Sequence, residues 1–219
     1  MKSTVTTVII GTGFTTINNG CFYACTSLTQ ITISTTITTI NYQAFRQCSA
    51  LTSITIPNNV TYLGGQSFYG CSLLSTITLS TGITRIYDYT FTNCTSLSGI
   101  TIPSTITVMD NRIFQGCTSL STISIPSSVT TMGSYFFYGC TSLASISFSG
   151  LNLLTMGSHF FYGCTILNNV SIPNSVTTMG SYFFYGCSGL TVVSISTSIT
   201  IIEEYFFYLC IAIITIIIP

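Results

Sequence analysis

Apolar and polar residues follow a single pattern along the chain, and this pattern repeats with a period of about 23 residues, in the range of known repeat architectures. In each unit a leucine or another aliphatic residue precedes a short stretch such as 54–56 (Ile-Thr-Ile), in which apolar and polar residues alternate. Alternation with β-branched residues is typical of a short strand. In five units a proline follows the second aliphatic residue and ends the strand, because proline has no N–H to donate to a sheet. The pattern then predicts a turn, a second short extended piece such as 129–133, and a closing stretch such as 134–140.

Cysteine and phenylalanine recur with the same spacing. A phenylalanine stands three residues before each of the nine periodic cysteines. Only the step from Cys140 to Cys164 is longer, by a single residue, and this extra residue falls within 149–152. One unit cannot bury its own apolar face, but stacked units align equal positions in columns. We therefore predict a buried column of small apolar thiols rather than disulfides or zinc ligands. The column comprises Cys25, Cys48, Cys71, Cys94, Cys117, Cys140, Cys164, Cys187 and Cys210.

The tenth cysteine, Cys21, lies outside this column. With Cys25, four residues on, it forms the only pair of cysteines that are close in sequence. We regard it as a candidate reactive or cross-linking thiol.

The consensus of the units is L-x-x-I-x-I-P-x-x-V-T-x-M-G-x-x-x-F-Y-G-C-T-S. This consensus resembles the BspA-like leucine-rich repeats, and the match covers nearly the whole chain. The resemblance implies a repeat solenoid in the form of a right-handed arc, with a parallel β-sheet on the concave side. It also implies short strands, turns and irregular or short helical segments on the outer side. The family resemblance further suggests an extracellular or cell-surface protein that binds protein or glycan, as an adhesin does.

The spacing predicts one solenoid over 1–219 without separate caps. Its units are 5–27, 28–50, 51–73, 74–96, 97–119, 120–142, 143–166, 167–189 and 190–212, followed by a terminal strand at 213–219.

Composition narrows the classes of partner. Charged residues make up only 4% of the chain, and the formal net charge is zero. A surface without a basic patch does not favour nucleic acid. Near-zero charge favours association between copies. No apolar run reaches the roughly 20 residues that a membrane-spanning helix needs, so we expect no membrane span. The first residues also lack the apolar run of a signal peptide.

Candidate catalytic groups are sparse. The chain has one histidine, His159, at a position where other units have tyrosine. No nucleophile, phosphate-binding or zinc motif occurs, so we predict no enzyme activity, no cofactor and no metal. We expect two aspartates and two arginines to form a small solvated charge cluster, and two glutamates stand near the end of the chain. These residues are Asp88, Asp110, Arg85, Arg112, Glu203 and Glu204.

Aromatic residues are enriched after residue 133, where the later units carry runs such as 135–138 (Tyr-Phe-Phe-Tyr). Four such residues exceed what one core-facing stripe can bury, so we predict a surface for association or glycan contact. The alternative is that the rings only cover the edges of the core. Threonine and serine columns on the strands and turns are a second candidate surface; ice binding there is disfavoured because Gln30, Gly99, Asn169 and Leu154 interrupt the columns. The candidate contact residues are Tyr135, Tyr138, His159, Tyr162, Tyr182, Tyr185, Tyr205 and Tyr208.

Both ends of the array are apolar. An uncapped strand rich in isoleucine is a template for another strand, which favours head-to-tail self-assembly into filaments as the alternative function. The candidate stacking residues are Val5, Val8, Ile10, Ile213, Ile216 and Ile218. Three Asn-x-Ser/Thr sites (Asn59, Asn93 and Asn169) are candidates for glycosylation. Asn93 is expected to be the least accessible because it precedes a core cysteine.

Overall fold

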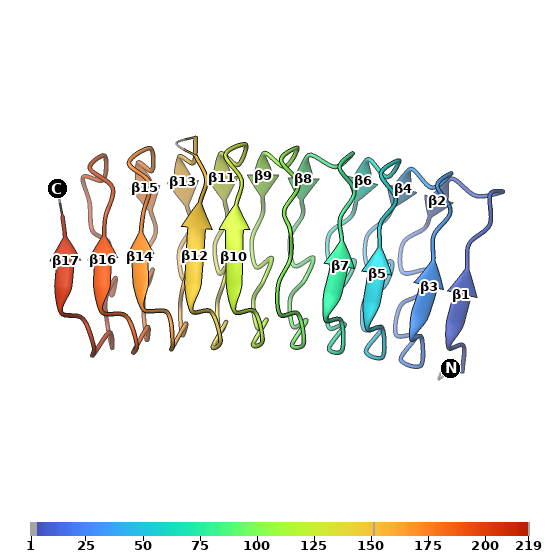
Figure 1. Ribbon diagram of the computed structural model, residues 1–219, viewed down its shortest axis with the longest axis horizontal. Coiled ribbons are helices and arrows are strands. Elements are labelled where there is room, and N and C mark those ends of the chain that lie inside the picture. Colours follow the sequence, from blue (N-terminus) through green and yellow to red (C-terminus); the bar gives the residue numbers. More distant parts are fainter. Residues whose placement is uncertain (1–3, 151, 219) are drawn as a thin grey trace.

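Each coil of the chain contributes a main strand, where Ile-x-Ile alternates, and a shorter second strand beyond the turn. The computed structural model describes residues 4–150 and 152–218. Within them the coils stack into a parallel β-solenoid of about nine turns (Figure 1). The main strands are β1 (Thr7–Ile9), β3 (Gln30–Thr32), β5 (Ser53–Thr55), β7 (Thr76–Thr78), β10 (Thr122–Ile125), β12 (Ser145–Phe148), β14 (Asn169–Ser171), β16 (Val192–Ser194) and β17 (Thr215–Ile217).

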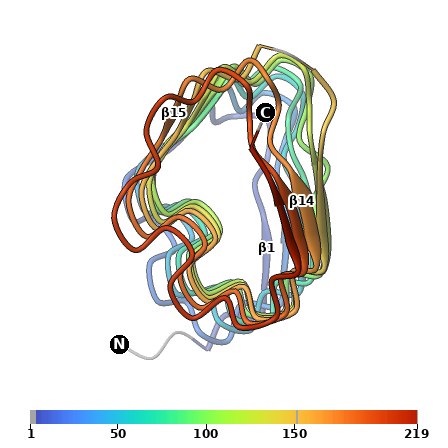
Figure 2. The same ribbon diagram turned by 90° about the vertical axis from the view of Figure 1, so that its left-hand side faces the viewer.

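The short strands form a second ladder on the opposite side of each coil (Figure 2). They are β2 (Thr16–Ile17), β4 (Thr39–Ile40), β6 (Tyr62–Leu63), β8 (Arg85–Ile86), β9 (Val108–Met109), β11 (Thr131–Met132), β13 (Thr155–Met156) and β15 (Thr178–Met179). Strand pairing in both ladders is parallel. The main row is interrupted between β7 and β10, where residues 98–102 are not a strand.

The register locates the extra residue of the longer unit. Thr122 pairs with Ser145 at the usual repeat spacing, whereas Thr131 pairs with Thr155, one position further along the chain than that spacing would give. The insertion therefore lies between β12 and β13, within the stretch that the sequence indicated. Of that stretch, Leu151 lies outside the described residues. The usual spacing returns in the next pairing, of Thr155 with Thr178, so one turn absorbs the insertion without shifting later columns.

Two parts of the expected architecture are not supported. The outer segments of the described residues are turns and irregular chain, with no helix. Closely spaced left-handed residues, such as Tyr135 and Gly139, bend the backbone too often for a helix to continue. The coils also follow one another in a nearly straight row, so a sheet on the concave side of an arc is not supported (Figures 1 and 2).

The core runs along the solenoid axis as columns of equal positions. The phenylalanines that precede the cysteines stack almost parallel from Phe22 to Phe207, with ring centroids 5.4 to 5.8 Å apart. Seven cysteines, from Cys48 to Cys187, are buried, while Cys25 and Cys210 at the ends are partly buried. Each buried thiol donates to the carbonyl of a phenylalanine in the preceding coil; Cys94, for example, lies 3.1 Å from the oxygen of Phe68. Burial raises the pKa of these thiols, so they stay protonated.

Candidate functional site

The aromatic residues after residue 133 lie on the closing turns, beside the short-strand ladder. Tyr135 has a left-handed backbone with φ of 55°, and the equivalent residues of the next coils share it. Earlier coils have the same conformation at Gln43 and Gln66, so it belongs to the coil and not to the aromatic residues. The left-handed residue and the residue three positions later both leave their side chains partly in solvent. The sequence therefore builds two parallel columns of side chains on one surface.

The first column comprises Tyr135, His159, Tyr182 and Tyr205. The second column comprises Tyr138, Tyr162, Tyr185 and Tyr208. Rings in the first column stack with centroids 4.4, 4.7 and 4.8 Å apart. Rings in the second column stack at 4.5, 4.5 and 5.1 Å. Within a coil the two columns are somewhat farther apart, since the ring centroids of Tyr135 and Tyr138 are separated by 5.8 Å.

The two columns border a shallow groove of about 390 Å³, which we call the tyrosine groove. Because the rings stack on one another, neighbouring rings cover their faces along the column. The groove therefore presents ring edges and polar atoms rather than open aromatic faces. Burial and the neighbouring phenols Tyr138 and Tyr185 raise the pKa of Tyr162, so its hydroxyl stays protonated and can both donate and accept a hydrogen bond.

The second phenylalanine of each later coil does not contribute to this surface. Phe136, Phe160 and Phe183 are fully buried, and Phe206 nearly so. Each lies edge-on to the core phenylalanine that follows it, as Phe160 does to Phe161 at 4.8 Å. Of the four aromatic residues in such a run, the two phenylalanines are therefore buried and only the outer two residues remain partly exposed. The core of the later coils is two phenylalanines wide beneath the groove.

Two polar atoms in this region are shielded from solvent and have no hydrogen-bond partner among the described residues. They are Nδ1 of His159 and Oε1 of Gln115, which stands one coil before Tyr138 in the second column. Burial, and then the charge of Arg112, lower the pKa of His159, which favours the neutral imidazole. A neutral imidazole keeps one acceptor nitrogen, and an amide oxygen is an acceptor. Both atoms are unpartnered, and neither is exposed to a ligand in this conformation.

Arg112 extends the first column toward the N-terminus. Its guanidinium carbon lies 5.2 Å from the ring centre of Tyr89 and 4.4 Å from that of Tyr135. Such stacking holds an arginine with its charge intact. A further hollow of about 360 Å³ lies beside it and shares Tyr135 with the tyrosine groove. The polar surface is therefore continuous from Arg112 to Tyr185.

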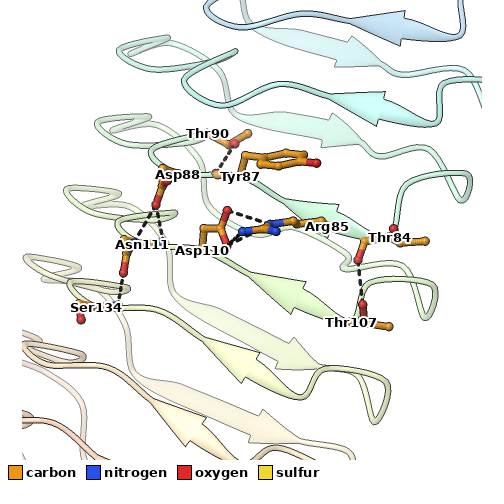
Figure 3. A network of polar contacts seen from close by, with 9 residues as sticks. All are labelled: Thr84, Arg85, Tyr87, Asp88, Thr90, Thr107, Asp110, Asn111 and Ser134. Carbon is orange, nitrogen blue, oxygen red and sulfur yellow. Dashed lines mark hydrogen bonds and ion pairs between the residues drawn. The ribbon is translucent and has the colours of Figure 1, made fainter.

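The expected charge cluster divides into separate contacts. Arg85 binds Asp110 through two nitrogens, with distances of 2.8 to 3.1 Å, whereas Asp88 accepts from the backbone and the side chain of Asn111 at 2.9 Å (Figure 3). Asn111 in turn accepts from the backbone of Ser134. These contacts link successive coils. In the described residues no group of three or more histidine, cysteine or acidic residues could hold a metal.

The remaining candidates lie elsewhere on the solenoid. Asn59, Asn93 and Asn169 are all exposed, and Asn93 has a left-handed backbone although the next residue, Cys94, is buried. The main strands border a second hollow, of about 510 Å³, that includes Thr32, Thr55 and Thr78.

The apolar end residues are partly or largely exposed. Val8, Ile10 and Ile213 are partly buried, whereas Val5, Ile216 and Ile218 are exposed. The two ends lie at opposite extremes of the row of coils, so the structure does not bring these two groups together within one chain (Figure 1).

Sequence reasoning missed that Arg112 and Gln115 continue the two columns toward the N-terminus. Both could have been found by following the columns toward the N-terminus, since each stands one repeat before a candidate tyrosine: Tyr135 and Tyr138, respectively. The signal was hidden because the residue type changes within the column while the position does not.

These columns and the parallel coils define a solenoid of the leucine-rich-repeat class. The chain belongs to the BspA type leucine-rich repeat family, whose sequence model matches residues 1–121 and 110–219. Proteins of this class are generally binding or structural proteins rather than enzymes. No helix of the described residues is long and apolar enough to cross a membrane. No curated protein matches the chain in sequence.

Solved structures share the fold. A leucine-rich repeat protein of T. pallidum is 25% identical, with a TM-score of 0.62 over 87% of this chain and 79% of its own. A leucine-rich cell surface protein of Faecalibacterium prausnitzii is 24% identical, with a TM-score of 0.52 over 97% of this chain and 79% of its own. The pneumococcal vaccine antigen PcpA is 18% identical, with a TM-score of 0.60 over 93% of this chain and 54% of its own.

Proposed function

We propose that the chain is a non-enzymatic interaction protein of the cell surface or extracellular space, adhesin-like, and that the tyrosine groove binds a glycan. The family and the cell-surface protein of similar fold support the location. The observation that supports this class of ligand is the double column of stacked rings that lines the tyrosine groove.

The chemistry of the groove favours a glycan over a protein. A protein hot spot needs an apolar anchor seated in a desolvated pocket. Here the apolar faces are covered by neighbouring rings, and what remains is a row of phenolic hydroxyls at the spacing of the coils. A chain of sugars offers hydroxyl donors and acceptors along its length.

Removal of the hydroxyls tests this proposal. The triple variant Y138F/Y162F/Y185F keeps the ring stack but removes three hydrogen-bonding groups from the second column. Each hydrogen bond contributes about 1 kcal/mol, so glycan affinity should fall roughly a hundredfold. The matched control is Y23F/Y42F/Y62F, which removes three hydroxyls from exposed tyrosines of the early coils, away from the groove.

Binding is measured on an array of neutral and acidic oligosaccharides and then by calorimetry on the strongest binder. Equal affinity of the two triple variants would contradict the proposal. A lack of glycan binding by the unmodified protein would also contradict it. If the unmodified protein instead binds a protein saturably, and the variant Y138F/Y162F/Y185F does not, the protein-binding alternative is favoured.

The second candidate function is structural, as a subunit that assembles head to tail. One observation favours it: β17 lies at the edge of its sheet, and Ile211 and Ile214 beside it are each 82% exposed. An exposed apolar edge strand pairs readily with another chain. Fibres that grow with concentration without ligand, and that I214K abolishes, would support this function. The control is I166K, which alters an exposed isoleucine within the array. Dispersed single particles at high concentration would exclude it.

A further inference from the structure

Arg112 differs from the other arginines of the described chain in having no acceptor for its guanidinium. Arg46 also stacks between two tyrosines, Tyr23 and Tyr69, but it donates to the side-chain oxygen of Gln66. Arg85 is paired with Asp110. For Arg112 the structure gives only the two ring contacts among the described residues. Its charge is therefore not compensated by a bound carboxylate of the same chain.

The stacking determines where that charge can be reached. Tyr89 and Tyr135 contact the guanidinium from the two neighbouring coils, so one ring lies on either side of it along the column. The N–H donors of a guanidinium lie in its plane, in a fork that matches a carboxylate. With a ring on either side, a ligand reaches the guanidinium from a direction across the column. An arginine held in this way is preorganised for an in-plane carboxylate and loses little side-chain entropy on binding.

Neighbouring acidic groups set a limit on what can bind. Asp88 borders the same hollow, and one of its oxygens already accepts two hydrogen bonds from Asn111. Asp110 is bound to Arg85. The carboxylate of Asp88 repels a densely charged polyanion, whereas a single carboxylate on Arg112 can be accommodated. The hollow thus favours one acidic group on a ligand that is otherwise neutral.

We infer that the glycan of the tyrosine groove carries a carboxylate, and that Arg112 binds it at the N-terminal end of the groove. The uncharged sugars then follow the two ring columns toward Tyr185. This inference rests on the proposed function, because it names the ligand class of the same site. It also gives the bound chain a direction, since among the described residues only the N-terminal end of the groove carries a cation without an acceptor.

The experiment compares oligosaccharides that carry a single terminal uronic acid with the same oligomers after that carboxyl group has been reduced to an alcohol. The unmodified protein should bind the acidic form about tenfold more tightly at low salt, and the difference should shrink as salt is added. R112Q should bind both forms with the affinity of the reduced form. R112K keeps the charge without the planar fork, and its preference should fall between the two. The control R46Q changes a stacked arginine that already has an acceptor, and it should keep the full preference.

The outcomes separate the two proposals. If the unmodified protein binds both forms equally, or if R112Q keeps the preference, the inference about Arg112 is wrong and glycan binding by the groove stands. If neither form binds, the inference fails; if the oligosaccharide array is also silent, the proposed function fails with it. Circular dichroism of R112Q and R46Q shows whether each variant has kept the fold. If R112Q alone unfolds, the preference of R112K decides, and a full preference there overturns the role of the guanidinium fork.

Discussion

Replacement of Phe160 by alanine tests whether the later coils have a double aromatic core. Phe160 is fully buried and stacks on Phe136 and Phe183 with centroids 5.2 Å away on either side. It is also edge-on to Phe137 at 5.6 Å and to Phe161 at 4.8 Å. One substitution therefore removes four ring contacts and leaves a cavity that spans three coils.

The expected cost follows from these contacts. Buried phenylalanine-to-alanine changes cost about 3–5 kcal/mol, including the cavity. Aromatic pairs add about 0.5–1.5 kcal/mol each beyond buried area, so a site with four pairs belongs at the upper end. We expect F160A to lower the free energy of unfolding by about 4–5 kcal/mol. The control F14A changes a phenylalanine that is 62% exposed, and it should cost less than about 0.5 kcal/mol.

Urea denaturation followed by far-ultraviolet circular dichroism measures both variants. In a stacked array each coil contacts only its neighbours, so F160A should also divide the transition into two steps, with the coils around Phe160 unfolding first. A cost below about 1.5 kcal/mol, or a value equal to that of F14A, would refute the double core. Such a result would instead indicate that Phe160 turns outward in solution and belongs to the surface.

Three further predictions follow from the same columns. A thiol reagent should label the exposed Cys21 first in the native protein and should reach the seven buried cysteines only after unfolding; rapid labelling of all ten would contradict the buried column. Because burial and Arg112 lower the pKa of His159 in the folded state, the unfolded chain binds its proton more readily; stability from the neutral ring is complete above the ordinary pKa near 6.5 and is lost as pH falls below it. Thermal midpoints at pH 7.5 and 5.5 should therefore differ more for the unmodified protein than for H159Y, and equal differences would oppose this. Finally, G157A should destabilise more than G139A, because a Cβ at Gly157 would lie 2.4 Å from the backbone nitrogen of Ser134, while Gly139 has open space and only the left-handed backbone to strain; equal denaturation midpoints would contradict the close approach.

The repeat made the fold predictable because register in a solenoid is a translation. Cys140 and Cys164 are one position further apart than the other neighbouring cysteines of the column, which predicts one longer coil. The strand pairing agrees, because the pairing of β11 with β13 is offset by one residue more than the pairing of β10 with β12. Short helical segments on the outer side, one of the expected forms, are absent from the described residues for a local reason. The left-handed conformation of Tyr135 is not visible as a break in the sequence, because this residue is an ordinary tyrosine.

The candidate site was predictable only as a set of columns. Sequence periodicity cannot tell which of two adjacent aromatic residues turns inward, because the closing turn has neither the period of a strand nor that of a helix. The backbone conformation at Tyr135 decides it, and Phe136 and Phe137 both become buried. Pairing of charges was equally out of reach, since it depends on side-chain length. Arg85 reaches Asp110, whereas Arg112 lies between two rings.

One column connects the core to the surface and explains why the groove lies in the later coils. The position before the core phenylalanine changes along the chain from small residues to aromatic ones, in the order Cys21, Ala44, Ser67, Thr90, Ile113, Phe136, Phe160, Phe183 and Phe206. Where this residue is phenylalanine, it and the core phenylalanine that follows form a pair. The residues directly before and after this pair are the tyrosines and the histidine of the groove columns. A rigid double layer of rings beneath a binding surface limits the motion of the groove side chains and so lowers the entropy lost when a ligand binds. Phe160 is fully buried, so it cannot contact a ligand directly. In the absence of urea, F160A should keep its fold and should nevertheless bind the glycan more weakly. Full affinity in a folded F160A variant would show that the buried layer only supports the coil and does not organise the groove above it.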